Sequence, residues 1–210
     1  MAILRSPYPH AAIRAIRTEV ARALPGVAAV LTAEDACADG LGYLPTRVRR
    51  LAPDGRPNFV PPFSVLAAGR VRHVGDAVAA VIAETIDIAK DALELIEVEY
   101  EALPAVTDTR RVIEQTAADP ARTLWPEAPG NICFVYDEGD RRAVERAFAA
   151  AAHVATVTLP ITRVSANPLE PRNAAAMYDE ATGRYTLYAA DQSPHVLRNE
   201  FAEAVLKIDE

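Results

Sequence analysis

Hydrophobic and polar positions recur along the chain in patterns that predict a mixture of strands and helices. The clearest is residues 76–84 (DAVAAVIAE), which are almost continuously apolar, as in a strand covered on both faces. Thr85 follows as a helix cap, and the residues after it repeat at helical spacing. The side chains expected to face the core are Ile86, Ala89, Leu93 and Ile96, and those expected to face water are Asp87, Lys90, Asp91 and Glu94. Burying the apolar four would contribute roughly 4 to 8 kcal/mol before conformational entropy is subtracted.

Shorter patterns flank this unit. A helix is predicted at 18–24 and a strand at 27–31, and residues 97–100 alternate charged and apolar side chains, as in a half-exposed strand. Residues 35–63 are rich in proline and arginine with little periodicity, which predicts a long loop.

The second half of the chain begins with a connector rich in proline, alanine and charge. Asp140 is then placed to cap a helix whose apolar side carries Val144, Ala147, Phe148 and Ala151. Val157, Leu159 and Ile161 alternate with Thr156, Thr158 and Thr162, which predicts a strand. Residues 179–183 predict a hairpin turn in which Gly183 takes the positive φ that such turns require.

Gln192 is the candidate site residue. It follows an alternating strand at 185–190 and precedes Ser193 and Pro194, which suit an N-cap and a first helical turn. The expected apolar face of that helix is Val196, Leu197, Phe201, Ala204 and Val205. The Gln192 amide would lie at a strand's C-terminal end, where ligands of α/β folds bind. A glutamine that bonds only to backbone is the alternative, and spacing alone does not separate the two.

The motif NPLEPR at 167–172 has two prolines that fix the backbone around Glu170 and Arg172. It is either a rigid wall beside a binding pocket or a turn leading into the next strand, with an internal Glu–Arg contact. Neither residue receives a chemical role from the sequence.

Composition narrows the function classes. The 210 residues carry a net charge of −7, so the chain has no electrostatic footprint for nucleic acid or an anionic membrane. No apolar run approaches the roughly 18 to 20 residues that span a bilayer, and no signal peptide pattern is present. Cys37 and Cys133 form no CxxC motif and are predicted to be free thiols, which favours a cytoplasmic location.

Motifs for chemistry within this chain are absent from the sequence. The four histidines have no metal-ligand spacing, and neither a GxSxG nucleophile elbow nor a phosphate-binding GxxxxGK motif occurs. We therefore predict no catalytic residue and no metal ligand here.

Several blocks carry a family resemblance, in order and over nearly the whole chain. They are LRSPYPHAAIRAI at 4–16, LPGVAAVLTAED at 24–35, VRHVGDAVAAVIAET at 71–85, DALELIEVEYEALPAV at 91–106, WPEAPGNICFVYDEGD at 125–140, and then NPLEPR, YDEATGRYTLY and DQSPH. This series resembles the large subunits of molybdenum hydroxylases, the family of xanthine dehydrogenases, aldehyde oxidases and aerobic carbon monoxide dehydrogenases.

The resemblance implies an α/β (α+β) fold: a hammerhead-like domain at 1–106, a connector at 107–137, and the truncated beginning of a molybdopterin-binding domain at 138–210. It also implies that Gln192 lies beside the molybdenum centre and donates an amide hydrogen bond toward a metal oxygen ligand. A neutral amide suits that task because it stabilises charge on oxygen without titrating.

The functional expectation is a fragment of an oxidoreductase large subunit, inactive alone, with no cofactor bound to the isolated chain. The resemblance implies the rest of the large subunit as a partner, together with iron–sulfur and FAD-carrying subunits or domains. The alternative is a stand-alone assembly or binding module that completes a split molybdenum enzyme. Sheet edges left unpaired after residue 154 also predict self-association.

Overall fold

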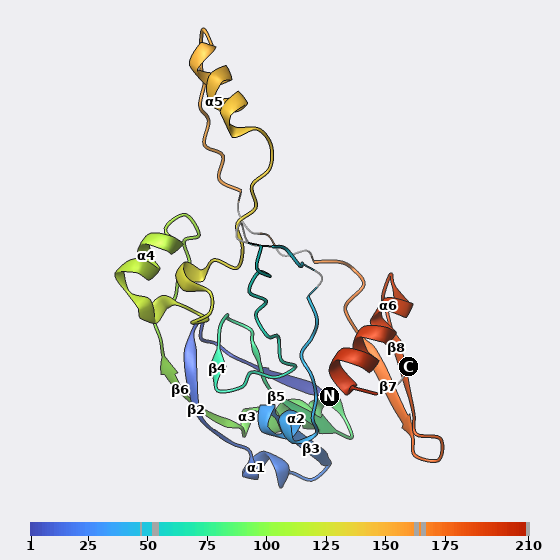
Figure 1. Cartoon of the computed structure of the whole chain (residues 1–210). Coiled ribbons are helices and arrows are strands. Elements are labelled where there is room, and N and C mark those ends of the chain that lie inside the picture. The colour runs from blue at the N-terminus through green and yellow to red at the C-terminus, as the bar shows by residue number, and fades with distance from the viewer. Residues whose placement is uncertain (47, 52–54, 162–163, 165–166, 209–210) are drawn as a thin grey trace. The chain divides into compact units, whose positions relative to one another are not determined.

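The computed structural model describes residues 1–46, 48–51, 55–161, 164 and 167–208 (Figure 1). The chain divides into two compact units. The first unit comprises residues 1–135 together with 195–210, and the second unit comprises residues 136–194.

The first unit contains two small antiparallel sheets. One has the strand order β1-β5-β3, with β1 at Ala2–Arg5, β5 at Ala77–Ala83 and β3 at Val27–Thr32. The other has the order β4-β2-β6, with β4 at Arg70–Val71, β2 at Ala11–Arg17 and β6 at Glu97–Ala102. Mixed helices and small sheets confirm the predicted α/β (α+β) class.

Helices cover and extend these sheets. They are α1 at Glu19–Arg22, α2 at Ala33–Ala38, α3 at Ile86–Glu94 and α4 at Val112–Ala118, with 3₁₀ turns at Pro120–Arg122 and Pro129–Asn131. Near the end of the chain, α6 at Pro194–Asn199 runs directly into η3, a π-helix at Glu200–Leu206.

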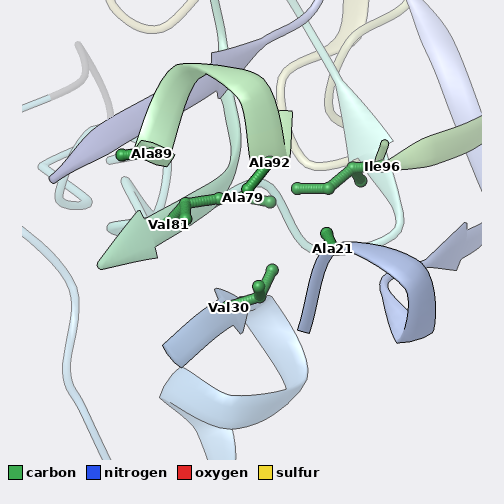
Figure 2. Close-up of a cluster of buried hydrophobic side chains, with 7 residues drawn as sticks. All are labelled: Ala21, Val30, Ala79, Val81, Ala89, Ala92 and Ile96. Atoms are coloured by element: carbon green, nitrogen blue, oxygen red, sulfur yellow. The ribbon is translucent and has the colours of Figure 1, made fainter. Parts of the chain in front are cut away.

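The main core lies where α3 packs on β5. Figure 2 shows Ala89 and Ala92 of α3 on one side of this cluster and Ala79 and Val81 of β5 against them. All four side chains have no exposed surface, and Val30 of β3 closes the cluster from the next strand. Because most of these side chains are methyl groups, the helix and the sheet approach closely and leave little room for a larger residue.

The predicted strand and helix of this unit are confirmed, but the buried face of the helix differs from the predicted one at two positions. β5 is buried from Val78 to Val81, and the Thr85 hydroxyl accepts the Ile88 N–H at the start of α3. Ile86, however, is 50% exposed, whereas Ala92, which was not expected on the buried face, is fully buried. The helix turns its alanine side to the sheet because small side chains allow the closest packing.

The predicted loop at 35–63 is shorter than expected. Its first residues belong to α2, which starts with a capping box in which the side chains of Thr32 and Asp35 accept backbone N–H groups of the first turn. The described residues between 39 and 69 form only two isolated bridges, Leu44 with Phe63 and Leu51 with Pro57. Positions 47 and 52–54 of the predicted loop lie outside the described residues.

Within the first unit, residues 120–131 are held in place by contacts with Arg72. Its guanidinium stacks 3.5 Å from the ring centroid of Trp125, and its Nε donates to the carbonyl oxygen of Leu124 at 3.3 Å. The Asn131 side chain accepts the Leu124 N–H and donates to the carbonyl oxygen of Arg122. This part of the predicted connector is therefore ordered by specific bonds.

The second unit holds α5 at Arg141–Ala150 and a hairpin of β7 at Ala174–Asp179 and β8 at Arg184–Ala189. The Asp140 carboxylate accepts the Ala143 N–H, which confirms the predicted cap of α5. Gly183 adopts a φ of 68° in the turn, which confirms the predicted hairpin.

The strand predicted at 156–162 is wrong over its described part. Residues 154–161 have no strand assignment, and the side chains of Val157, Leu159 and Ile161 are 75%, 77% and 94% exposed. Thr162 lies outside the described residues. Alternation is a signal of half burial, but the described residues 154–161 are exposed on both sides, Thr156 and Thr158 included, so no buried face is formed there.

Both cysteines, Cys37 and Cys133, are exposed and free, as predicted. Among the residues that the structure describes, no helix is both long and apolar enough to cross a lipid bilayer.

Candidate functional site

Gln192 lies at a bend between a strand and a helix, the position predicted for it. β8 ends at Ala189 and α6 begins at Pro194. The Gln192 side chain is exposed, and none of its polar atoms has a hydrogen-bond partner among the described residues. The amide therefore keeps both its donor and its acceptor groups for a ligand.

The neighbouring carboxylate shapes this bend. Asp191 Oδ1 accepts the backbone N–H of Ser193 at 2.6 Å, which closes an Asx-type turn before the helix. Ser193 directly precedes Pro194, the first residue of α6, so this bond fixes the backbone at the entry to the helix. The exposed side chains at this bend are thus the neutral amide of Gln192 and the carboxylate of Asp191, which already accepts a backbone hydrogen bond.

The hairpin that leads to Gln192 is held by its own turn. The Asp179 carboxylate accepts the Thr182 hydroxyl at 2.7 Å and the Ala181 N–H at 3.0 Å, and these bonds hold the pKa of Asp179 below its usual value. Tyr178 and Tyr185 pair across the strands with ring centroids 4.6 Å apart. These contacts fix the register of β8 and hence the position at which it ends.

The NPLEPR motif forms a bend at Leu169–Glu170 immediately before β7. It is thus a turn leading into the strand, but the expected Glu170–Arg172 contact is not formed: both side chains are exposed and no ion pair joins them. An exposed ion pair gains little over hydration, so nothing holds these two side chains together.

The helix after Gln192 docks through residues that differ in part from the predicted apolar face. Val205 is 3% exposed, as expected of that face, and Ala202, which was not predicted, is 7% exposed. Val196 and Phe201 remain 41% and 37% exposed. Within residues 200–206 the winding is π-helical, which changes the angle between successive side chains from that of the α-helix on which the prediction was based.

The loop after α2 meets the end of this helix. The Gly42 N–H donates to the carbonyl oxygen of Val205 at 2.7 Å, within the first unit. No pattern in the sequence marks Gly42, because a glycine in an aperiodic loop signals a turn and not a contact 163 positions away.

A separate cleft of about 450 Å³ lies in the first unit between β2, α1 and α2. Two of its charged groups pair: Arg22 lies 3.5 Å from Asp35, and Asp35 also accepts from the backbone N–H and the hydroxyl of Thr32. Those hydrogen bonds, the backbone one first, lower the pKa of Asp35. Asp35 is therefore a structural carboxylate of this cleft and not a free general base.

Metal ligands do not gather anywhere in the described ranges 1–46, 48–51, 55–161, 164 and 167–208. No group of three or more His, Cys, Asp or Glu side chains lies close enough there to hold a metal ion.

Two families match successive parts of the sequence. Residues 1–104 match the family described as aldehyde oxidase and xanthine dehydrogenase, a/b hammerhead domain, and residues 124–210 match the molybdopterin cofactor-binding domain.

Individual proteins give the same result. The carbon monoxide dehydrogenase large chain of Afipia carboxidovorans is 36% identical over 203 residues, covering 93% of this chain and 24% of that protein. A probable xanthine dehydrogenase subunit of Bacillus subtilis is 34% identical over 202 residues, covering 95% of this chain and 24% of that protein. In structure, quinoline 2-oxidoreductase from Pseudomonas putida 86 superposes with a TM-score of 0.76 at 35% identity, over 97% of this chain and 24% of that one. The chain thus spans about a quarter of the length of these relatives.

Proposed function

The chain belongs to the molybdenum hydroxylase large subunits, and from this premise we propose that it serves as one portion of a molybdenum-dependent oxidoreductase of the carbon monoxide dehydrogenase and xanthine dehydrogenase type. The observation that carries the proposal is the exposed, unpartnered amide of Gln192 between β8 and α6, inside the region similar to a cofactor-binding domain.

Gln192 is the cofactor-binding residue in this proposal. The molybdenum–molybdopterin cofactor, when bound, supplies the redox chemistry of hydroxylation with water as the oxygen source. The Gln192 amide N–H would donate a hydrogen bond toward an oxygen ligand of that cofactor's metal, and the amide would stay uncharged throughout. The residues present fit that group, because a neutral amide with both functions free suits a site that changes charge.

The remaining parts of the reaction belong to other residues and chains. The partners we propose are the remainder of the large subunit and iron–sulfur and FAD-containing subunits or domains, which pass electrons away from the site. The proposed division of this chain is a hammerhead domain at 1–106, a connector at 107–137 and the start of the cofactor domain at 138–210. The proposed location is the cytoplasm.

In isolation the chain is expected to be inactive and to hold no molybdenum. It contributes one amide contact, and no acid, base or nucleophile is assigned to it. Purified protein should give no stoichiometric molybdenum by elemental analysis and no dye-linked oxidation of carbon monoxide, purines or aldehydes. Stoichiometric metal together with turnover would contradict this part of the proposal.

The test of Gln192 uses a chimera. This chain replaces the matching quarter of the Afipia carboxidovorans large chain, and the enzyme is assembled with that organism's other subunits. The unsubstituted chimera should contain molybdenum and oxidise carbon monoxide. Gln192→Ala should lower kcat about 10²-fold, in line with the loss of one preorganised donor to a developing charge.

Gln115→Ala is the matched control, because it removes the other glutamine of the chain, which lies in α4. That variant should retain activity. If Gln192→Ala kept the full kcat in an active chimera, Gln192 would have no role at the cofactor.

A second candidate function is a stand-alone assembly or binding module that completes a split enzyme. The exposed apolar side chains of Val157, Leu159 and Ile161 favour it, since a partner chain would cover them. Co-expression with a separate polypeptide carrying the other three quarters of the large subunit distinguishes the two functions. A stable, molybdenum-containing complex would support the module, and the failure of the two chains to associate would exclude it.

A further inference from the structure

A loop of the first unit and the last helix of the chain meet closely at Gly42. The Gly42 N–H donates to the carbonyl oxygen of Val205, and Gly42 also lies against the carbonyl group of Ala204. A Cβ atom placed on Gly42 would overlap the Ala204 oxygen and lie 3.3 Å from the Lys207 side chain. Contacts below 3.0 Å do not occur for real Cβ atoms, and the atom in the way belongs to the backbone. Only a hydrogen atom fits at this position.

Space and not backbone conformation is the reason for glycine here. Gly40, two residues earlier, has a φ of 71°, and the place where its Cβ atom would lie has no neighbour within 4 Å, whereas Gly42 is not among the residues with positive φ. The backbone dihedral angles of Gly42 would therefore allow an alanine, but its Cβ atom would clash with the helix.

The helix presents its free carbonyl groups to this loop. The last turn of a helix leaves C=O groups without intrahelical partners, and Gly42 satisfies that of Val205. Lys207 ends the π-helix with a φ of 56°, and the Ile208 N–H bonds to the Ala202 oxygen at 3.0 Å. With Ala202 and Val205 buried, the helix is fixed in rotation as well as in position.

We propose that Gly42 is a positioning residue that seats the helix of residues 195–206 on the first unit and, through the chain, restricts Gln192. Its relevance to the cofactor rests on the function proposed above. Gln192 precedes His195 by three residues, and three extended residues span at most roughly 11 Å. A seated helix thus fixes one end of the short segment that carries Gln192, and a released helix does not.

The test compares amide hydrogen exchange of the full chain with that of Gly42→Ala. The variant should lose protection about 10-fold or more at residue 42 and at Ile208, while the β5 amides keep theirs. Gly40→Asn is the control, because it adds a larger side chain into open space at a φ that asparagine tolerates. It should exchange like the parent protein.

A second readout follows Gln192 itself. A nitroxide label is attached to Gln192→Cys in a chain carrying Cys37→Ser and Cys133→Ser. Adding Gly42→Ala should increase the label's mobility at 192 and leave unchanged a label at Leu159, an exposed position of the second unit. A general destabilisation of the protein would instead change the mobility of both labels.

Unchanged protection at 42 and 208, or unchanged mobility at 192, would overturn the proposal. If Gly42→Ala also lost protection in β5, Val205→Ala becomes the deciding variant, since it weakens the same contact from the helix side. In that variant the loss of protection from amide hydrogen exchange should be confined to residues 42 and 200–208. Any other result contradicts the positioning role of Gly42. Failure of the Gln192→Ala chimera test would leave these exchange results unaffected, so the two proposals fail separately.

Discussion

The Nδ1 atom of His10 lies 2.8 Å from the carbonyl oxygen of Pro104, and this bond joins the residue before β2 to the segment after β6. The imidazole is 1% exposed, and its Nε2 atom is buried without a hydrogen-bond partner among the described residues. With Nδ1 as the donor, the ring is neutral. A second proton would have to sit on Nε2 in an apolar interior with Arg70 and Arg72 nearby.

The first prediction concerns pH. Burial first, and the two arginines as well, hold the pKa of His10 below 6.5, even though the Pro104 bond acts in the opposite direction. The unfolded chain therefore takes up a proton as the pH falls through 6.5 while the folded chain does not, so the free energy of unfolding decreases below that pH and is flat above it. Urea unfolding at a series of pH values from about 8 to about 5.5 measures this slope.

His10→Asn should remove the slope, and His153→Asn, at an exposed position, should keep it. A parent-like pH slope in the His10 variant would assign the effect to another group.

The second prediction concerns the stacking of Arg72 on Trp125. Arg72→Ala should lower the free energy of unfolding by about 1 to 2 kcal/mol, because it removes a partly desolvated cation–π contact. Arg72→Lys keeps the charge but loses the planar stack, so it should recover only part of the loss. Trp125 is the single tryptophan, and its emission should shift to longer wavelength in both variants.

Arg110→Ala serves as a comparison, since its ion pair with Asp108 lies on the surface. Arg110→Ala should change neither the midpoint of unfolding nor the emission wavelength of Trp125. Equal effects at 72 and 110 would show that the stack contributes nothing specific.

The third prediction concerns the close contact between α3 and β5. Ala92→Leu should lower the free energy of unfolding by about 1 to 3 kcal/mol, because the added methylenes must displace the sheet or the helix. Lys90→Leu, on the exposed side of the same helix, should leave stability near that of the parent. Chemical denaturation of the two variants under one set of conditions gives the comparison.

The fourth prediction concerns self-association. β7 and β8 pair only with each other in the described part of the chain, so each offers an outer edge of free backbone groups. Light scattering should detect dimers or larger species whose proportion rises with concentration. Met177→Lys places a charge on the exposed face of β7 and should shift the chain toward monomer. A monomeric parent protein at every concentration would rule the edges out as an interface.

The sequence was a good guide where a local pattern and the tertiary environment agree. β5 and α3 combine a continuous apolar run with a capped helix, and the β7–β8 hairpin has a turn that requires Gly183. In these elements the side chains that decide the local structure are also the ones that pack.

Errors arose where the packing partner was decisive. The alternation of Val157, Leu159 and Ile161 predicts a strand only if one side of it is buried, and these residues are exposed on both sides. Ile86 fits a helical apolar face, but the alanines give the closer contact with β5. The prediction leaves out α2 because it starts the loop at Asp35, whereas Thr32 and Asp35 together have the spacing of a capping box.

At the candidate site, too, the sequence predicts the local features and not the long-range contact. The position of Gln192 followed from the strand, the proline and the helix that surround it. The docking of the helix on Gly42 did not, because it depends on a π-helical winding and on two segments distant in sequence. Long-range contacts between backbone groups leave no trace in side-chain periodicity.

The methyl-lined contact beneath α3 has a consequence for how this domain tolerates variation. A library that randomised the whole helix would recover folded members with diverse residues at Asp87, Lys90, Asp91 and Glu94, all directed to solvent, and almost none altered at Ala89 or Ala92. Tolerance would therefore be strongly one-sided around the helix axis, and the side facing the sheet would act as a size filter admitting only the smallest side chains.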